Sequence, residues 1–333
     1  QLAIGFQTRM KRLFLTGETG FVGKIFYGMA EEIANTYGWE LIPAPVKYDL
    51  LDSASLNRLL RQVRPDGVIH LAGQSFVPDA IKNPMRTLQV NLVGTLHLLQ
   101  ALKRNKFAGD FLYVSSSDVY GQVTAAELPI QETQSTRPHN PYAMSKAGAE
   151  MLCFQWSCSE PWRIITARPF NHIGPGQRKE FVVSSIAREI ARIRLGLCEP
   201  VIHVGDIDVT RDFLDVRDLA RAYLGLLAKG ENGGIYNVCS GQDTRIRDII
   251  DRQARIGGVD LEIAHDPERY RPSDQRQVRG DNSKLRAATS WQPQISLDQS
   301  LRDVLADWER LELNADLPAK RQSGQMPTGL HAR

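Results

Sequence analysis

The sequence predicts an α/β protein built on a doubly wound parallel sheet. Short apolar segments typical of buried strands alternate with longer helical patterns, beginning at residues 13–16. The first of these segments runs into Gly17, Gly20 and Gly23 and then into a helical pattern. A strand, a glycine-rich turn and a helix in this order are the unit that opens a Rossmann sheet and binds a phosphate group.

Length and composition narrow the class of protein. At 333 residues the chain exceeds what one core usually serves, which predicts two domains or one large α/β unit. A hydrophobic content of 42%, a charged content of 24% and a net charge of +3 are ordinary for a soluble protein and do not indicate a nucleic-acid partner. The four cysteines have no metal-ligand spacing, so we expect no metal and reduced thiols in the cytoplasm. No apolar run approaches the ~20 residues of a membrane span.

The glycine turn predicts a phosphate site. Gly17 permits the tight turn, and Gly20 lets a pyrophosphate approach the backbone where the next helix begins, which we expect at about Lys24. Gly23 lets that helix pack close to the strand. The spacing is G-x-x-G-x-x-G rather than the G-x-G-x-x-G of many dinucleotide sites.

The second strand, expected at residues 40–46, bears on the choice of cofactor. An acidic residue directly after this strand would bind a ribose 2′-hydroxyl group, but Lys47 stands there instead. A cation suits a 2′-phosphate, so NADP(H) is favoured over NAD(H). Asp49, which precedes Leu50, is expected to contact the adenosine or to cap the helix at residues 55–63.

Two further strand ends are candidates for the site. Residues 67–73 form a buried strand that ends in Leu71, Ala72 and Gly73, and residues 111–114 end in a run of serines from Ser115. Strand ends of open α/β sheets line the ligand crevice, although serine also caps turns. Asn91 interrupts the apolar pattern of a long helix at residues 83–103, where it binds a backbone group through a π-bulge or water, or faces solvent.

The pair Tyr142 and Lys146 carries the chemistry. Asn140-Pro141 breaks the preceding loop, and residues 142–156 follow as a helix. Residues four apart share a helix face, so the ammonium is expected beside the phenol, where it would lower the phenol pKa toward neutrality. A phenol tuned in this way can donate or accept a proton. The alternative is a chance pair on a solvated helix face.

The order of these motifs resembles the extended short-chain dehydrogenase/reductases that act on nucleotide sugars. The resemblance covers roughly residues 10–308. The motifs that carry it are Thr16-Gly17-Glu-Thr-Gly20-Phe-Val-Gly23, Asp49-Leu50, His70-Leu-Ala-Gly73, Asn91-Leu-Val-Gly-Thr95, Ser115-Ser-Ser-Asp-Val-Tyr-Gly121, Tyr142-x-x-x-Lys146, Arg168-Pro-Phe-Asn171, Arg211-Asp-Phe-Leu-Asp-Val216 and Tyr236-Asn-Val-Cys-Ser-Gly241.

This resemblance implies a role for each matching residue. It implies Tyr142 as the general acid, Lys146 as the holder of the nicotinamide ribose, and Ser116 as the partner of the sugar C4 oxygen. The implied cofactor-binding residues are Gly17, Gly20, Phe21, Val22, Gly23, Lys47, Asp49, Leu50, Leu71, Ala72, Gly73, Asn91, Tyr142, Lys146 and His172. The implied substrate-binding residues are Ser116, Ser117, Asn171, Arg211, Tyr270, Arg271 and Asp274.

The resemblance also implies two domains. It assigns residues 10–172 and about 212–240 to an NADP-binding Rossmann domain, and residues 173–211 and 241–311 to a smaller C-terminal α/β substrate domain. The arginines of the helix at 181–195 are expected on a solvated face. Residues 1–9 are expected to be a leader or an added segment, and 312–333 a polar tail.

The implied activity is NADPH-dependent reduction of the C4 keto group of GDP-4-dehydro-6-deoxy-D-mannose to GDP-D-rhamnose, by a homodimer. A 4,6-dehydratase or a 4-epimerase is the alternative among enzymes, and a non-catalytic nucleotide sensor is the alternative outside them. A dehydratase needs a further acid/base group besides the tyrosine. The residue implied at that position is Asp118, one methylene shorter than the Glu of related dehydratases.

Overall fold

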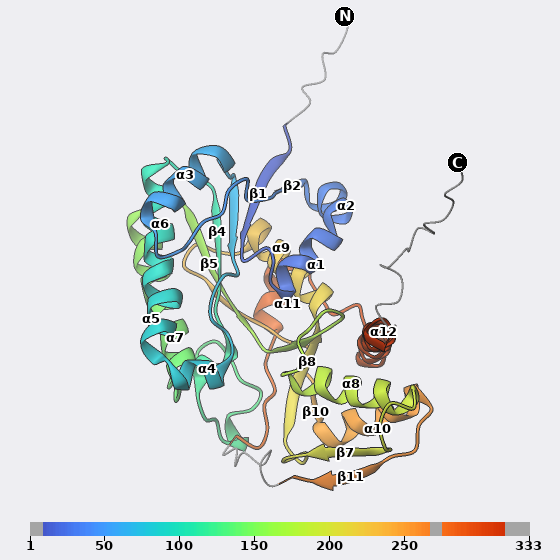
Figure 1. Cartoon of the computed structure of the whole chain (residues 1–333). Coiled ribbons are helices and arrows are strands. Elements are labelled where there is room, and N and C mark those ends of the chain that lie inside the picture. Colours follow the sequence, from blue (N-terminus) through green and yellow to red (C-terminus); the bar gives the residue numbers. More distant parts are fainter. Residues whose placement is uncertain (1–8, 267–274, 317–333) are drawn as a thin grey trace, which may run out of the picture.

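A six-stranded parallel sheet forms the centre of the protein. The computed structural model describes residues 9–266 and 275–316 (Figure 1). The strand order is β2-β1-β3-β4-β5-β9. The strands are β1 (Lys11–Thr16), β2 (Trp39–Ile42), β3 (Gly67–His70), β4 (Asp110–Val114), β5 (Arg163–Pro169) and β9 (Ile235–Val238). The chain leaves β1 for β2 on one side and returns to β3 on the other, so the strand order reverses at β1, and the carboxyl ends of β1 and β3 are where open α/β sheets bind ligands.

Helices cover both faces of this sheet, as the alternating pattern predicts (Figure 1). One face carries α1 (Phe21–Gly28), α9 (Val216–Lys229) and α11 (Ser283–Thr289), whose apolar residues share a core with the sheet. The other face carries α3 (Ser53–Val63), α6 (Gly94–Arg104) and α7 (Pro141–Ser159) around a second core. The remaining segments along this half are α2 (Ala30–Glu32), η1 (Ile33–Tyr37), α4 (Val77–Lys82), α5 (Pro84–Leu88), η2 (Gln89–Val93), η3 (Ser117–Tyr120) and η4 (Ala125–Glu127).

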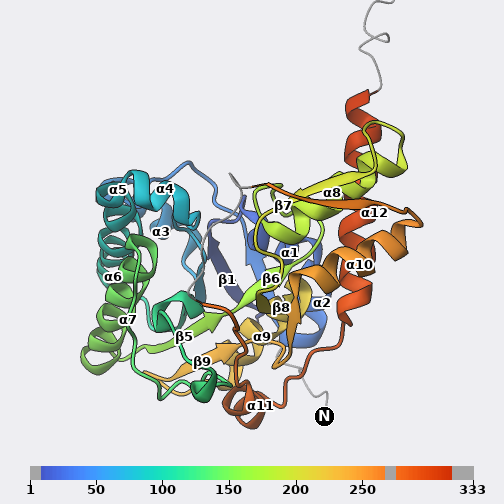
Figure 2. The same ribbon diagram turned by 90° about the horizontal axis from the view of Figure 1, so that it is seen from below.

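A smaller part packs below the carboxyl ends of the strands (Figures 1 and 2). Its third core joins α8 (Val182–Arg194), α10 (Ile246–Gly257) and α12 (Leu297–Asp316). It also holds a three-stranded sheet, β10-β8-β6, and a two-stranded sheet, β11-β7. Their strands are β6 (Asn171–Ile173), β7 (Val201–Val204), β8 (Thr210–Asp215), β10 (Asp243–Arg245) and β11 (Glu262–His265).

Several strands and helices begin or end at residues other than those expected. The second strand stops at Ile42 instead of residue 46, because Pro43 and Pro45 cannot donate to a sheet ladder. The first helix begins at Phe21, with Gly20 as its N-cap, rather than at Lys24. The helix expected at residues 83–103 is real but runs as α5, a π-helical turn η2 and then α6.

The last helix also differs from expectation. It continues to Asp316, although we expected a polar tail from residue 312. Two arginines of α8 explain this extension, since Arg188 and Arg192 pair with opposite oxygens of Glu312 at 2.6 and 2.8 Å. These arginines therefore fasten α12 to α8 and are not merely a solvated face. The segment around α11, expected in the substrate part, packs Leu285 and Trp291 into the core of the large sheet.

Candidate active site

The glycine turn forms a cradle in which side chains would not fit. Gly17 has φ +75°, and a Cβ atom there would lie 2.9 Å from the backbone of Ala72. A Cβ atom on Gly23 would lie 2.5 Å from the carbonyl oxygen of Glu18. The amide of Gly20 donates to the carbonyl oxygen of Gly17 at 3.0 Å. This close packing leaves backbone amides at the N-terminus of α1 as the exposed groups, which fits the diphosphate of a dinucleotide.

An acidic side chain from another part of the chain lies near the end of β2. Glu18, from the glycine turn, accepts hydrogen bonds from the amide of Ala44 at 3.1 Å and from the phenol of Tyr27 at 3.0 Å. No acid follows β2 directly in the sequence, but the Glu18 carboxylate lies close to the end of this strand in the structure. Lys47 is exposed beside this region. The phenol of Tyr48 also reaches the turn, where it accepts from the Gly17 amide at 3.2 Å.

Asp49 and Leu50 have different environments. Asp49 is exposed, and its carboxylate accepts from the amide of Leu51 at 2.9 Å. The cap of α3 is Asp52, which accepts from the amides of Ala54 and Ser55. The side chain of Leu50 is buried in the core, so only its backbone is available to a ligand.

Asn91 supports the loop after β3. It lies in the π-helical turn, which bears out one of the expected arrangements and excludes a solvent-facing one. Its carboxamide exchanges two hydrogen bonds with the backbone of Gln74, at 2.8 and 2.9 Å, and donates to Ser145 at 2.9 Å. It thereby holds the chain next to Gly73 against the helix that carries Lys146. Both ends of its amide are occupied by the protein, so its role is to position the loop after β3.

The end of β4 meets the start of α7. Asn140 caps α7 by accepting from the amide of Ala143 at 2.8 Å, with Pro141 at the first helical position. This places the phenol of Tyr142 near Ser116, whose side chain lowers the phenol pKa. Ser117 opens the short helix η3 beside them. The structure therefore brings the predicted acid and the predicted serine together.

The expected effect of Lys146 on the phenol is wrong. Burial raises the pKa of Tyr142, the nearby carboxylate of Asp118 raises it further, and the hydrogen bond from Ser116 opposes this. The Lys146 ammonium is directed elsewhere: it donates to the carbonyl oxygen of Val114 at 2.8 Å and lies 5.2 Å from the centre of the Tyr113 ring. Burial lowers the pKa of Lys146 to about 8. Desolvation of a phenol outweighs a neighbouring cation that is not aimed at it.

The substrate half contributes residues from β6 and β8. His172 stacks on Phe21, with ring centres 6.1 Å apart and planes at 6°. Asn171, beside it, is exposed. Arg211 is half-buried on β8, where Asp118 raises its pKa against the larger lowering effect of burial. Tyr270, Arg271 and Asp274 lie outside the described residues.

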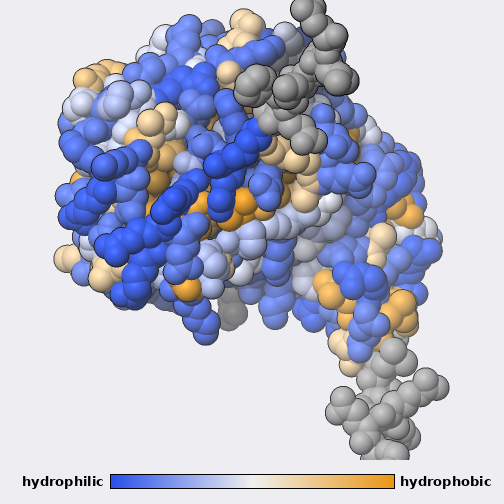
Figure 3. Space-filling view, turned by 90° about the horizontal axis from the view of Figure 1, so that it is seen from above, coloured by the Kyte–Doolittle hydropathy of each residue, from blue (hydrophilic) through white to orange (hydrophobic). Residues whose placement is uncertain are grey.

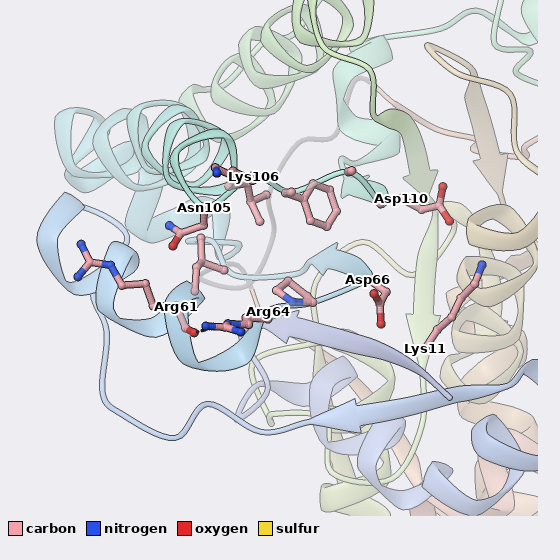
Figure 4. Close-up of a pocket in the computed structure, with 13 residues that line it drawn as sticks. Lys11, Arg61, Arg64, Asp66, Asn105, Lys106 and Asp110 are labelled. Carbon is pink, nitrogen blue, oxygen red and sulfur yellow. Dashed lines mark hydrogen bonds between the residues drawn. The ribbon is translucent and has the colours of Figure 1, made fainter. Parts of the chain in front are cut away.

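A separate cavity of about 820 Å³ lies at the amino ends of the central strands, at the end of the sheet opposite to Ser116 (Figure 4). Its labelled cations, among them Arg61, Arg64 and Lys106, point in different directions. Asp66 is already bonded to the amide of Arg12, and Asp110 to Arg163. The cavity therefore offers no converging set of charges and is remote from Tyr142.

Comparison with known proteins decides the family. Residues 43–304 match the family model described as GDP-mannose 4,6 dehydratase. The chain belongs to this family of nucleotide-sugar enzymes. Over 299 residues it is 55% identical to the GDP-6-deoxy-D-mannose reductase of Pseudomonas aeruginosa, covering 90% of this chain and 97% of that one. It is 30% identical to a GDP-mannose 4,6-dehydratase of Vibrio cholerae, covering 80% and 79%.

Solved structures agree with this placement. The structure of RMD from Pseudomonas aeruginosa complexed with NADPH superposes with a TM-score of 0.87 at 54% identity, covering 90% of this chain and 99% of that one. A UDP-glucose 4-epimerase of Thermus thermophilus in complex with NAD superposes with a TM-score of 0.76 at 28% identity, covering 89% and 98%. The Rossmann fold and the resemblance to extended short-chain dehydrogenase/reductases are thereby confirmed.

Sequence reasoning missed several residues of this family site. Glu18 lies inside the glycine motif but contacts Ala44 beyond the end of β2, and Tyr48 contacts the glycine turn from a position that carries no motif. Asp212 is another, because its buried carboxylate accepts from the amides of Ser240, Gly241 and Gly280 and so joins β8 to two distant loops. Burial raises the pKa of this carboxyl to about 6. A polar residue inside the matching motif Arg211-Asp-Phe-Leu was the available signal for Asp212.

Proposed function

We propose that this protein is an NADPH-dependent reductase that converts GDP-4-dehydro-6-deoxy-D-mannose to GDP-D-rhamnose. The observation that carries the proposal is 55% identity to a GDP-6-deoxy-D-mannose reductase along almost the full length of both chains. The relative whose structure was solved with NADPH supports the cofactor. The cradle at Gly17, Gly20 and Gly23 fits a dinucleotide because it presents amides and excludes side chains.

The protonation state of Tyr142 suits the reductive direction. When bound, NADPH supplies the hydride for the sugar C4 carbon. The chain must then give a proton to the C4 oxygen, and a phenol with a raised pKa remains protonated at neutral pH. Ser116, near the same phenol, would hold the C4 oxygen in line with it. Lys146, on the same face of α7, would hold the nicotinamide ribose.

The substrate half supports recognition of the diphosphate. Arg211 is a guanidinium on β8 within electrostatic reach of Asp118, the carboxylate that also acts on Tyr142. Guanidinium groups match phosphate oxygens in geometry and charge. We assign Arg211 and Asn171 to the diphosphate, and Ser116 with Ser117 to the sugar. Arg271, Tyr270 and Asp274 remain assigned to the nucleotide by resemblance alone.

The dehydratase reaction is the second candidate, because the matching family model carries that name and Asp118 lies beside Tyr142. Dehydration starts with oxidation at C4, which needs a phenolate rather than a phenol. It also needs a carboxylate at the sugar, and the shorter Asp118 is drawn back by about 1.5 Å relative to Glu. Such a displacement can cost ~10²-fold in rate.

One experiment separates these candidates and the non-catalytic sensor. The purified protein would be incubated with NADPH and GDP-4-dehydro-6-deoxy-D-mannose, and separately with GDP-mannose and NADP⁺. We expect oxidation of NADPH in the first mixture and GDP-D-rhamnose by NMR. The proposal fails if the 4-keto-6-deoxy product forms from GDP-mannose at a rate comparable with ketone reduction. Absence of turnover in both mixtures, with NADPH bound, would favour the sensor.

We also propose a homodimer. Large apolar side chains are exposed together on α4, α5 and α7, which lie side by side in Figure 1: Ile81, Met85, Met144, Met151 and Phe154. An apolar surface of this kind is typical of an interface. By contrast, the face seen from above is mostly hydrophilic, with a band of apolar residues near its centre (Figure 3). Light scattering at micromolar concentration tests this, and Met151→Glu with Phe154→Glu should yield monomers.

The cytoplasm is the proposed location. In the described residues no helix is long and apolar enough to cross a membrane. The support for the cytoplasm is chemical: Cys153, Cys158, Cys198 and Cys239 are all free thiols. Fractionation of the native host tests it.

A further inference from the structure

Helix α7 carries three buried polar groups in one row. Tyr142, Lys146 and Glu150 follow one another at intervals of four residues, so they share one face of the helix. All three side chains are buried. The proposed reaction uses Tyr142 and Lys146 but gives no task to Glu150, which lies one turn behind the lysine on the side away from the phenol.

Glu150 forms a two-pronged ion pair with Arg168 of β5. The guanidinium donates to both carboxylate oxygens, at 2.9 and 2.7 Å. Arg168 also stacks over the ring of Tyr120 at 4.7 Å. A buried ion pair is often no more stabilising than apolar residues of similar volume, because both charges lose their hydration. Stability alone is therefore a weak reason for this pair.

The other titratable groups near Lys146 carry no charge at neutral pH. They come from β3, β4 and α7 itself. Burial lowers the pKa of His70 to about 3 and raises the pKa values of Tyr113, Tyr142 and Cys153. Among the described residues that face Lys146, charge therefore comes from Glu150 and, through it, from Arg168. Burial lowers the pKa of Lys146, and Cys153 and Glu150 oppose that effect; of these two, the Glu150 carboxylate is the one that is charged at neutral pH.

We propose that Glu150 and Arg168 are positioning residues that keep the Lys146 ammonium charged and directed at the Val114 carbonyl. Glu150 supplies the negative charge that stabilises the ammonium. Arg168 holds the Glu150 carboxylate in place through two hydrogen bonds, and its own positive charge partly offsets the attraction between Glu150 and Lys146. The inference deepens the proposed function, on which it rests, since a charged Lys146 is what would hold the nicotinamide ribose. It concerns the ionisation of the protein itself, which can be measured without substrate.

The test is a titration of Lys146 in Glu150→Gln. Protein labelled with ¹³C at the lysine ε-carbons would be titrated by NMR, with the Lys146 signal assigned by its loss in Lys146→Arg. Removal of one nearby opposite charge should lower the Lys146 midpoint by about 1–2 pH units. Glu160→Gln is the matched control, because Glu160 caps the same helix and pairs with Lys103 far from the site. Its midpoint should equal that of the parent protein.

The opposite substitution gives the opposite sign. Arg168→Met leaves the carboxylate beside Lys146 without its competing cation, so the midpoint should rise above that of the parent. The double variant Glu150→Gln with Arg168→Met contains no unpaired buried charge and should fold even where a single variant does not. Its midpoint should lie between those of the two single variants. An unmoved midpoint in Glu150→Gln, or shifts of the same sign in both single variants, overturns the inference.

Activity provides the second readout. The fall of kcat/KM at alkaline pH should move to lower pH in Glu150→Gln and to higher pH in Arg168→Met, in step with the NMR midpoints. A purely structural role would reduce activity at all pH values without moving this limb. If the NMR midpoints shift as expected but no variant reduces the ketosugar, the proposed function fails while the inference about Lys146 stands.

Discussion

The ammonium of Lys146 donates a hydrogen bond to the carbonyl oxygen of Val114 at 2.8 Å, at the carboxyl end of β4. This bond fixes the Lys146 cation at the end of β4, two residues before Ser116. Lys146 itself lies one helical turn after Tyr142 on α7. The ammonium is therefore directed at the strand end, and the raised pKa of Tyr142 keeps the phenol protonated.

Activity should fall at alkaline pH. The pKa of Lys146 is lowered to about 8 by burial, so the ammonium is present below pH 8 and is lost as the pH rises through that value. Because the raised pKa of Tyr142 keeps the acid protonated there, the loss should follow the lysine alone. A profile of kcat/KM for NADPH between pH 6 and pH 10 (a range of roughly two units on either side) checks this. A flat profile through pH 8 would contradict it.

Tyr142→Phe should abolish most turnover and spare cofactor binding. Only the proton donor is removed, and loss of a general acid typically costs ~10²–10⁴-fold in rate. Stopped-flow measurement of NADPH oxidation gives the rate, and fluorescence titration gives the Kd for NADPH. Tyr37→Phe, at a tyrosine of η1 outside the site, is the control. Reduction at the parent rate would show that Tyr142 is not the acid.

Arg211→Ala should weaken binding of the nucleotide sugar more than that of NADPH. Loss of a charge-assisted hydrogen bond costs roughly 1.5–3 kcal/mol, which is about a ten- to hundredfold rise in KM for the sugar substrate. Arg61→Ala, in the cavity at the amino ends of the strands, serves as the matched control. The same comparison applies to Arg271→Ala, whose position lies outside the described residues. Unchanged KM values in both Arg211 and Arg271 variants would move the diphosphate site elsewhere.

NADPH should be preferred over NADH, and Lys47 should carry part of the preference. Lys47 is exposed near the end of β2, where a 2′-phosphate would gain from a cation. Glu18 is occupied by the Ala44 amide and the Tyr27 phenol, which limits its use as a ribose acceptor. In Lys47→Ala, kcat/KM should decline for NADPH and change little for NADH. Equal values for the two cofactors in the parent protein would refute the preference.

The sequence determined the layout of the nucleotide half and the pairing of its site motifs. The apolar runs at β1, β3, β4 and β5 are short and end in turn residues, so the hydrophobic pattern and the turn residues were enough to locate these strands. The i, i+4 spacing of Tyr142 and Lys146 is a property of any helix, so their shared face followed from the sequence. The π-helical turn at Asn91 was among the expected arrangements because a lone polar residue interrupted an apolar helix.

Tertiary structure alone decided the electrostatics of the site and the contacts between distant segments. The phenol pKa rises because burial and, to a smaller extent, Asp118 act on Tyr142, and neither effect can be read from a spacing of four residues. Glu18 reaches the chain beyond the end of β2 because the glycine turn that carries Glu18 follows β1, the neighbouring strand of β2. The extension of α12 depends on Arg188 and Arg192, which lie 124 and 120 residues away from Glu312 in the chain. Desolvation and long-range pairing depend on the completed packing, whereas helix and strand periodicity depend only on neighbours along the chain.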